Sequence, residues 1–209
     1  MNLHDSTRTL HLGPQPAAAK GALILLHGRG ADAEDIIGLA DHFPVQDLAV
    51  FAPQATQNSW YPQRFFVPLE ENEPWLSNAI GLVEGLVAEI HAAGIPYGKI
   101  GIAGFSQGGC LALEYAMRHP RAYGLVAGMS SALVGPPKLT RSPADLGGVP
   151  VLVACATHDA HIPLPLVEES IATLKASGAD LTSQIFRGYD HTIFPEEIDW
   201  LSTRLAGWT

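Results

Sequence analysis

Hydrophobic residues gather in short runs that alternate with stretches of mixed polarity along the chain. Six runs have the length and continuity of buried strands, and a seventh alternates between apolar and polar positions. Between the runs, apolar residues recur at helical spacing, and two of these stripes end at a glycine. The predicted strands are 7–12, 21–27, 47–52, 98–105, 123–130, 150–156 and 180–188, and the helical stripes lie within 36–43, 80–90, 111–117, 167–174 and 198–205.

Strands that alternate with helices predict an α/β fold. We expect a mostly parallel, twisted sheet of about seven strands with helices on both faces, which makes three layers. A chain of 209 residues with 47% hydrophobic content can bury a large core, so we expect one domain over residues 1–209. Ligands of an open parallel sheet bind outside the carboxyl ends of its strands. The loops that follow the strands should therefore carry the chemistry.

The segment from 53 to 77 does not fit this rhythm. It is long, rich in aromatic residues and prolines, and has no clear period. Long irregular segments in compact domains are usually functional or disordered. We therefore interpret residues 53–77 as a loop that shapes a substrate pocket.

Charge and composition exclude several classes of function. The net charge of −9 argues against nucleic acid and against anionic membrane surfaces, since both require a basic face. No apolar run approaches the length of a membrane span, and the N-terminus lacks a leader pattern. We expect no stable membrane insertion and a cytoplasmic protein. The two cysteines, Cys110 and Cys155, lie in apolar surroundings and indicate neither a disulfide framework nor a metal site.

The sequence GFSQG at 104–108 is the strongest chemical signal. It joins an apolar strand to a helical stripe, so Ser106 should lie on a sharp turn that exposes its hydroxyl. Gly104 and Gly108 would let the strand and the helix approach closely. The same pattern also arises by chance in glycine-rich chains, but the strand before it and the helix after it favour a nucleophile.

A serine nucleophile needs a general base and a group that orients the base. Of nine histidines, His191 follows the last strand on the expected face, whereas His4, for example, is interpreted as solvated or capping. Asp159 follows the strand 150–156 and is the preferred acid; Asp190 is a weaker candidate, because a carboxylate rarely reaches the ring of its sequence neighbour. The order Ser106, Asp159, His191 is that of an α/β-hydrolase sheet.

A metal site is the alternative for this region, because two histidines flank Asp159. His158 and His161 could both be ligands. However, no third ligand with suitable spacing is visible, and a catalytic zinc usually has three protein ligands. We therefore assign no metal-ligating residues.

The sequence HGRGADA after the second strand should supply half of an oxyanion hole. The backbone N–H groups of Arg29 and Gln107 would point at the developing negative charge. The same letters contain GxGxxA, a dinucleotide-binding fingerprint, but the acid expected at the end of the next strand is absent. The Arg29 side chain has two open interpretations: it pairs with an anionic substrate group, or it forms an ion pair with Glu34 or Asp35.

Aromatic and aliphatic residues of the irregular segment and the later loops are the candidate walls of the substrate pocket. An alternative for each is a place in a small core beneath a long loop. The candidates are Trp60, Tyr61, Phe65, Phe66, Trp75, Leu133, Ile162 and Leu164.

Six motifs occur in order along the chain: LHGRG, APQ, SWYP, GFSQGG, THDAHIP and GYDH. Together they resemble the phospholipase/carboxylesterase family of small α/β-hydrolases, which includes bacterial carboxylesterases and acyl-protein thioesterases. The arginine at 29 and the insert FVPLEENEPW make the chain more similar to the bacterial carboxylesterase branch. The resemblance implies a serine hydrolase with no metal or organic cofactor, small-molecule ester or thioester substrates, and a homodimer.

We therefore expect a carboxylesterase-type serine hydrolase. Its substrates would be acyl or aryl esters of small to medium size, cleaved through an acyl-enzyme intermediate. An acyl-protein thioesterase or a lysophospholipase is an alternative within the family. A non-catalytic ligand-binding homologue is the alternative from another class, since a fold does not fix a function.

Overall fold

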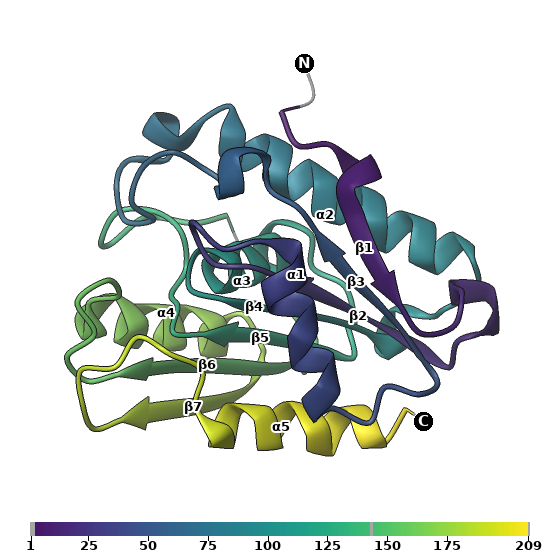
Figure 1. The fold of residues 1–209 in the computed structure, drawn as a ribbon. Helices are drawn as coiled ribbons and strands as arrows, with labels where there is room; N and C mark the ends of the chain where they lie inside the picture. Colours follow the sequence, from purple (N-terminus) through teal and green to yellow (C-terminus); the bar gives the residue numbers. More distant parts are fainter. Residues whose placement is uncertain (1–2, 143, 209) are drawn as a thin grey trace.

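The computed structural model describes residues 3–142 and 144–208, and its centre is a seven-stranded sheet (Figure 1). The strands lie in the order β1-β3-β2-β4-β5-β6-β7. Only β1 is antiparallel to its neighbour, and all the other pairs are parallel. The strands are β1 (Thr9–Leu12), β2 (Gly21–Leu26), β3 (Leu48–Pro53), β4 (Ile100–Phe105), β5 (Leu125–Met129), β6 (Pro150–Ala156) and β7 (Asp180–Phe186).

Helices cover both faces of the sheet, so the fold has three layers (Figure 1). One face packs against α2 (Trp75–Ala92), α3 (Gln107–Arg118) and α4 (Leu164–Ala176). The other packs against α1 (Ala33–Ile37), which continues as a 3₁₀ helix, and α5 (Pro195–Ala206). The predicted α/β-hydrolase fold is confirmed, with a strand in each of the seven predicted runs.

Burial explains why the strands were visible in the sequence. Every residue of β2, β3 and β5 is buried, as expected for strands that are covered on both faces. Strand β7 lies at the sheet edge and alternates between exposed and half-buried positions. The carboxyl ends of β4, β6 and β7 point to one edge, which brings the loops after Phe105, Ala156 and Phe186 together.

The irregular segment is shorter than predicted. Helix α2 begins at Trp75, so the last three residues of the 53–77 range belong to the helix. The segment before α2 contains two short 3₁₀ helices, Thr56–Asn58 and Leu69–Asn72. Spacing alone missed this first helical turn because proline and acidic residues directly precede Trp75.

Over residues 3–142 and 144–208, none of the helices combines the length and the apolar character needed to cross a bilayer.

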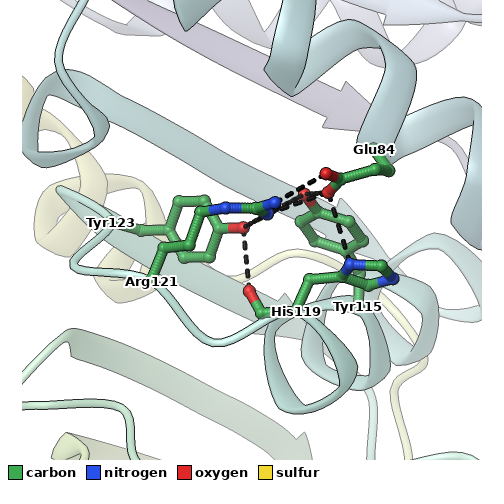
Figure 2. A network of polar contacts seen from close by, with 5 residues as sticks. All are labelled: Glu84, Tyr115, His119, Arg121 and Tyr123. Atoms are coloured by element: carbon green, nitrogen blue, oxygen red, sulfur yellow. Dashed lines mark hydrogen bonds and ion pairs between the residues drawn. The ribbon is translucent and has the colours of Figure 1, made fainter.

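A polar network ties α2 to α3 and to the loop before β5 (Figure 2). The Arg121 guanidinium donates to both carboxylate oxygens of Glu84, at 2.6 and 2.8 Å. The Tyr115 hydroxyl also donates to Glu84, and the Tyr123 hydroxyl donates to the His119 carbonyl. Burial alone would raise the pKa of Glu84, but hydrogen bonds from Arg121 and Tyr115 outweigh it and lower that pKa.

We predict that Arg121→Ala lowers the free energy of unfolding by about 1–2 kcal/mol at pH 7, because it leaves a partly buried carboxylate without its bidentate partner. The effect should shrink as pH falls below the ordinary pKa of a glutamate and through the lowered pKa of Glu84, since protonation removes the charge. Urea unfolding followed by circular dichroism measures the loss at pH 7 and its dependence on pH. Lys20→Ala removes the exposed Lys20–Asp47 pair and is the control, expected to cost less than about 0.5 kcal/mol. Equal losses in the two variants would contradict this role of the network.

Candidate active site

Ser106 lies between β4 and α3 in a backbone conformation that side chains rarely adopt. Its φ is 53° and its ψ is −117°, and its N–H donates to the Met129 carbonyl at 2.9 Å. A strained, positive-φ serine at a strand-to-helix turn holds its hydroxyl away from the sheet. Ser106 is half-buried and its hydroxyl faces a cavity.

Two glycines make this turn possible because strand and helix touch there. A Cβ atom at Gly104 would lie 2.4 Å from the backbone of Gly108, and one at Gly108 would lie 2.1 Å from the Leu26 carbonyl oxygen. Both distances are far below a van der Waals contact, so a side chain at Gly104 would force α3 away from β4 and one at Gly108 would force α3 away from β2. The sequence interpretation of these glycines agrees with the structure.

The structure brings Ser106, His191 and Asp159 into one chain of contacts. His191 Nε2 lies 2.8 Å from Ser106 Oγ, and His191 Nδ1 lies 2.6 Å from Asp159 Oδ2. The carboxylate can only accept, so Nδ1 carries the proton and Nε2 offers its lone pair to the serine hydroxyl. This arrangement can withdraw a proton from Ser106 when the hydroxyl attacks an electrophile. Asp190, the weaker candidate acid, forms no hydrogen bond or ion pair with the His191 ring within the described part of the chain.

The Asp159 side chain is fully buried, and hydrogen bonds surround both of its oxygens. Oδ1 accepts from the backbone N–H groups of His161 at 2.7 Å and Ile162 at 3.1 Å. Beside Oδ2 lies the Cys155 thiol, whose sulfur is 3.7 Å away. Burial, and then the charge of Asp159, raises the pKa of Cys155 to about 12, so the thiol stays protonated and donates. The carboxylate therefore has a fixed orientation toward His191.

Two backbone N–H groups beside Ser106 are available as donors. Arg29 and Gln107 both line the cavity that contains Ser106. Within the described part of the chain, neither N–H has a hydrogen-bond acceptor. Gln107 is the first residue of α3, where backbone N–H groups are unpaired and the helix dipole is positive. These groups could stabilise an oxyanion formed at Ser106.

The cavity at Ser106 has a volume of about 520 Å³. Of the candidate pocket residues, Tyr61, Phe65 and Ile162 line it. The structure adds lining residues that sequence reasoning did not assign to the pocket. Among them are Phe105, Cys110, His161, Arg64 and Asp35.

The other five candidate pocket residues lie outside the cavity lining, for separate packing reasons. Trp60 is fully buried between the rings of His4 and His27, and Trp75 packs edge-on against His4. Phe66 packs against Phe65, whereas Leu133 and Leu164 lie at α4. Leu133 lines a separate small cleft, and Leu164, the first residue of α4, packs against the core.

Buried histidines hold the irregular segment in place. His4 is 2% exposed, so the interpretation of His4 as solvated or capping is wrong. Its Nε2 contacts the Trp60 carbonyl, and its Nδ1 accepts from the backbone of Thr56. His27, which sequence reasoning did not single out, accepts from the backbone N–H of Ala55. Its position in a strand-end LHG sequence was the signal that could have found it.

The Arg29 side chain forms an ion pair with neither Glu34 nor Asp35, the two acids considered from the sequence. No carboxylate of the described residues, including those of Glu34 and Asp35, lies within ion-pair distance of its guanidinium. The guanidinium donates instead to backbone carbonyls of the irregular segment. His158, one of the candidate ligands for a metal, stacks on Tyr189, while His161 packs near His191. In the regions 3–142 and 144–208, no three His, Cys, Asp or Glu side chains form a cluster suited to a metal ion.

Comparison with known proteins finds similar sequences and a similar solved structure. The sequence model of the family described as Phospholipase/Carboxylesterase matches residues 13–209. A phospholipase/carboxylesterase crystal structure from Dyadobacter fermentans superimposes with a TM-score of 0.92, at 38% identity over 99% of both chains.

Two curated relatives are more distant in sequence. Acyl-protein thioesterase 1 of Eremothecium gossypii is 28% identical over 93% of this chain and 91% of its own length. Lysophospholipase-like protein 1 of Mus musculus is 26% identical over 90% of this chain and 88% of its own length. The similarity therefore spans nearly the whole of each protein.

A buried acid supports the loop that carries His191. The Glu197 side chain on α5 accepts from the backbone N–H of Phe194 at 2.5 Å, while the Ser130 hydroxyl donates to the Thr192 carbonyl. Glu197 is fully buried. Burial raises the pKa of Glu197 to about 7, with help from the charge of Glu196 and against hydrogen bonds from the backbones of Phe194 and Ser130.

We predict that Glu197 makes the protein less stable as pH rises. The raised pKa means that the folded state holds a proton that the unfolded state releases, so stability is full below pH 4.5 and falls until about pH 7. The loss is on the order of 3 kcal/mol. Glu197→Gln cannot ionise, so its midpoint of thermal unfolding should rise relative to the unaltered chain between pH 5 and pH 8. Parallel pH profiles for the two proteins would contradict a raised pKa.

Proposed function

Because the chain belongs to the phospholipase/carboxylesterase family, a family of hydrolases, we propose that it is a serine hydrolase of carboxylic esters. The observation that carries the proposal is the continuous contact from Ser106 Oγ through His191 to the buried Asp159 carboxylate. A hydrogen-bonded chain of nucleophile, base and orienting acid is the arrangement that activates a serine for acyl transfer.

In the proposed reaction, His191 Nε2 takes the proton of Ser106 as the oxygen attacks the ester carbonyl. The negative charge develops on the carbonyl oxygen, where the N–H groups of Arg29 and Gln107 donate to it. His191 then gives its proton to the leaving alcohol, and an acyl-enzyme remains on Ser106. Water attacks this ester with His191 again as base, which releases the carboxylic acid and restores the serine.

The cavity supports substrates of small to medium size. Its volume of about 520 Å³ lies in the lower half of the usual range for small-molecule sites. Tyr61, Phe65, Phe105 and Ile162 offer apolar surface for an acyl or aryl group. The names of the two curated relatives favour a thioesterase or a lysophospholipase as the second candidate, and both reactions would use the same residues.

We predict that the protein hydrolyses 4-nitrophenyl esters and that Ser106→Ala lowers kcat/KM about a thousandfold or more. Ser202, on α5 with its hydroxyl bound to the His42 carbonyl, gives the matched control, and Ser202→Ala should keep full activity. Across acyl chains from acetate to dodecanoate, the largest kcat/KM should fall among the short and medium chains.

The same assay includes an acyl-CoA and a palmitoylated peptide. A larger kcat/KM for either of these than for all the nitrophenyl esters would replace the esterase assignment with the thioesterase. Turnover that survives Ser106→Ala would exclude the serine mechanism, and absence of any turnover would favour the ligand-binding homologue.

A further inference from the structure

The side chains of Arg29 and Gln107 meet at one backbone carbonyl. Arg29 Nη2 donates to the Tyr61 carbonyl oxygen at 3.0 Å, and Gln107 Nε2 donates to the same oxygen at 2.8 Å. The backbone N–H groups of both residues lie beside Ser106 with no acceptor among the described residues. Their side chains thus leave the reacting centre and bind the irregular segment instead.

The Arg29 guanidinium binds three consecutive carbonyls of that segment. Besides Tyr61, it donates to the Pro62 carbonyl at 2.7 Å and to the Gln63 carbonyl. A guanidinium is planar and presents its donors in a fixed fork, so the three peptide groups and the arginine define each other's positions. A further backbone bond, from Gly30 N–H to the Asn58 carbonyl at 2.8 Å, fastens the same turn.

The Gln107 amide makes a second, buried connection to the same segment. Gln107 is only 5% exposed. Its Oε1 accepts from the backbone N–H of Trp60 at 3.0 Å while its Nε2 donates to Tyr61. The amide therefore binds the peptide groups on either side of the Trp60–Tyr61 peptide bond and fixes the first turn of α3 against the segment.

The Arg29 turn needs such support because its own backbone is permissive. Arg29 lies between Gly28 and Gly30, and Gly30 has a φ of 82°. Glycine loses more conformational freedom on folding than any other residue, so this turn gains little rigidity from its local sequence. An oxyanion donor is effective only when its direction is set before the charge develops.

We propose that Arg29 and Gln107 are positioning residues whose side chains hold their own backbone N–H groups in place for the oxyanion, with the Tyr61 carbonyl as the common anchor. This inference rests on the proposed serine-hydrolase function. It gives the irregular segment a second role, because the segment joins the two halves of the oxyanion hole besides lining the cavity.

An alternative role for Arg29 is to pair with an anionic group of the substrate. Both terminal nitrogens of the guanidinium already donate to carbonyls, which disfavours that role. Lysine separates the two ideas, since it keeps the positive charge but cannot reproduce the planar fork.

The test measures kcat and KM of Arg29→Ala and Arg29→Lys on a neutral ester, 4-nitrophenyl butyrate, and an anionic one, 4-nitrophenyl hydrogen succinate. We expect both variants to lose about tenfold in kcat on both esters, less than the hundred- to thousandfold loss of a whole donor. KM should stay within about twofold, because the lost interaction acts mainly in the transition state. If Arg29→Ala does not fold, the kcat of Arg29→Lys alone distinguishes the positioning role from the pairing with substrate.

The inhibition constant Ki of phenylboronic acid is a second measurement, and a purely structural role of Arg29 would leave it unchanged. Phenylboronic acid forms a tetrahedral adduct with an active serine, and one boronate oxygen occupies the oxyanion position, so its Ki should rise about tenfold in step with the fall in kcat. Gln107→Ala should behave like the Arg29 variants. Arg8→Ala, at an exposed arginine outside the cavity lining, is the control and should match the unaltered chain.

Full kcat in the Arg29 variants would overturn the inference while leaving the proposed function intact. Loss confined to the anionic ester in Arg29→Ala, with recovery in Arg29→Lys, would also overturn it and assign the arginine to substrate binding. Absence of Ser106-dependent turnover in the unaltered chain would overturn the proposed function and this inference together.

Discussion

The contact between β4 and α3 is the constraint on which the rest of the site depends. With only a hydrogen at Gly104 and at Gly108, the helix comes close enough to touch the backbone of β2 at Leu26. That approach forces Ser106 into a positive φ and places the unpaired N–H groups of the α3 N-terminus beside its hydroxyl. A side chain at Gly104 would separate β4 from α3, and one at Gly108 would separate β2 from α3. Either change would move Ser106, the first turn of α3 and the contact with Met129 at the same time.

The partners of Ser106 reach it because the parallel strands end at one edge. Asp159 follows β6 and His191 follows β7, so two loops that are distant in sequence meet beside a third. Further hydrogen bonds then restrict the positions of these two side chains. Backbone N–H groups fix one oxygen of Asp159, and Glu197 holds the end of the His191 loop. The irregular segment closes the opposite side of the cavity, where Arg29 and Gln107 bind it. The geometry supports acyl transfer because each of these groups is held before a substrate arrives.

The strands could be predicted from the sequence because they follow from local patterns. The placement of Ser106, Asp159 and His191 at one edge could be predicted because it follows from a topological rule. Buried parallel strands are continuous apolar runs, and the order of loops along the sheet edge follows from their connections. The walls of the cavity could not be found in this way. Trp60 and Tyr61 are sequence neighbours with similar side chains, yet Tyr61 faces the cavity and Trp60 lies between His4 and His27. That choice depends on tertiary packing, as does the selection of backbone carbonyls over nearby acids by Arg29.

The most direct test of Ser106 as the nucleophile is to map where a fluorophosphonate attaches to the chain. The reagent forms a covalent bond with a serine only when a neighbouring base activates it, and peptide mass spectrometry identifies the modified residue. We expect one adduct per chain, on Ser106, and none in Ser106→Ala or on the buried Cys110 of the same cavity. An unmodified chain, or an adduct at another residue, would contradict the assignment of Ser106 as the nucleophile.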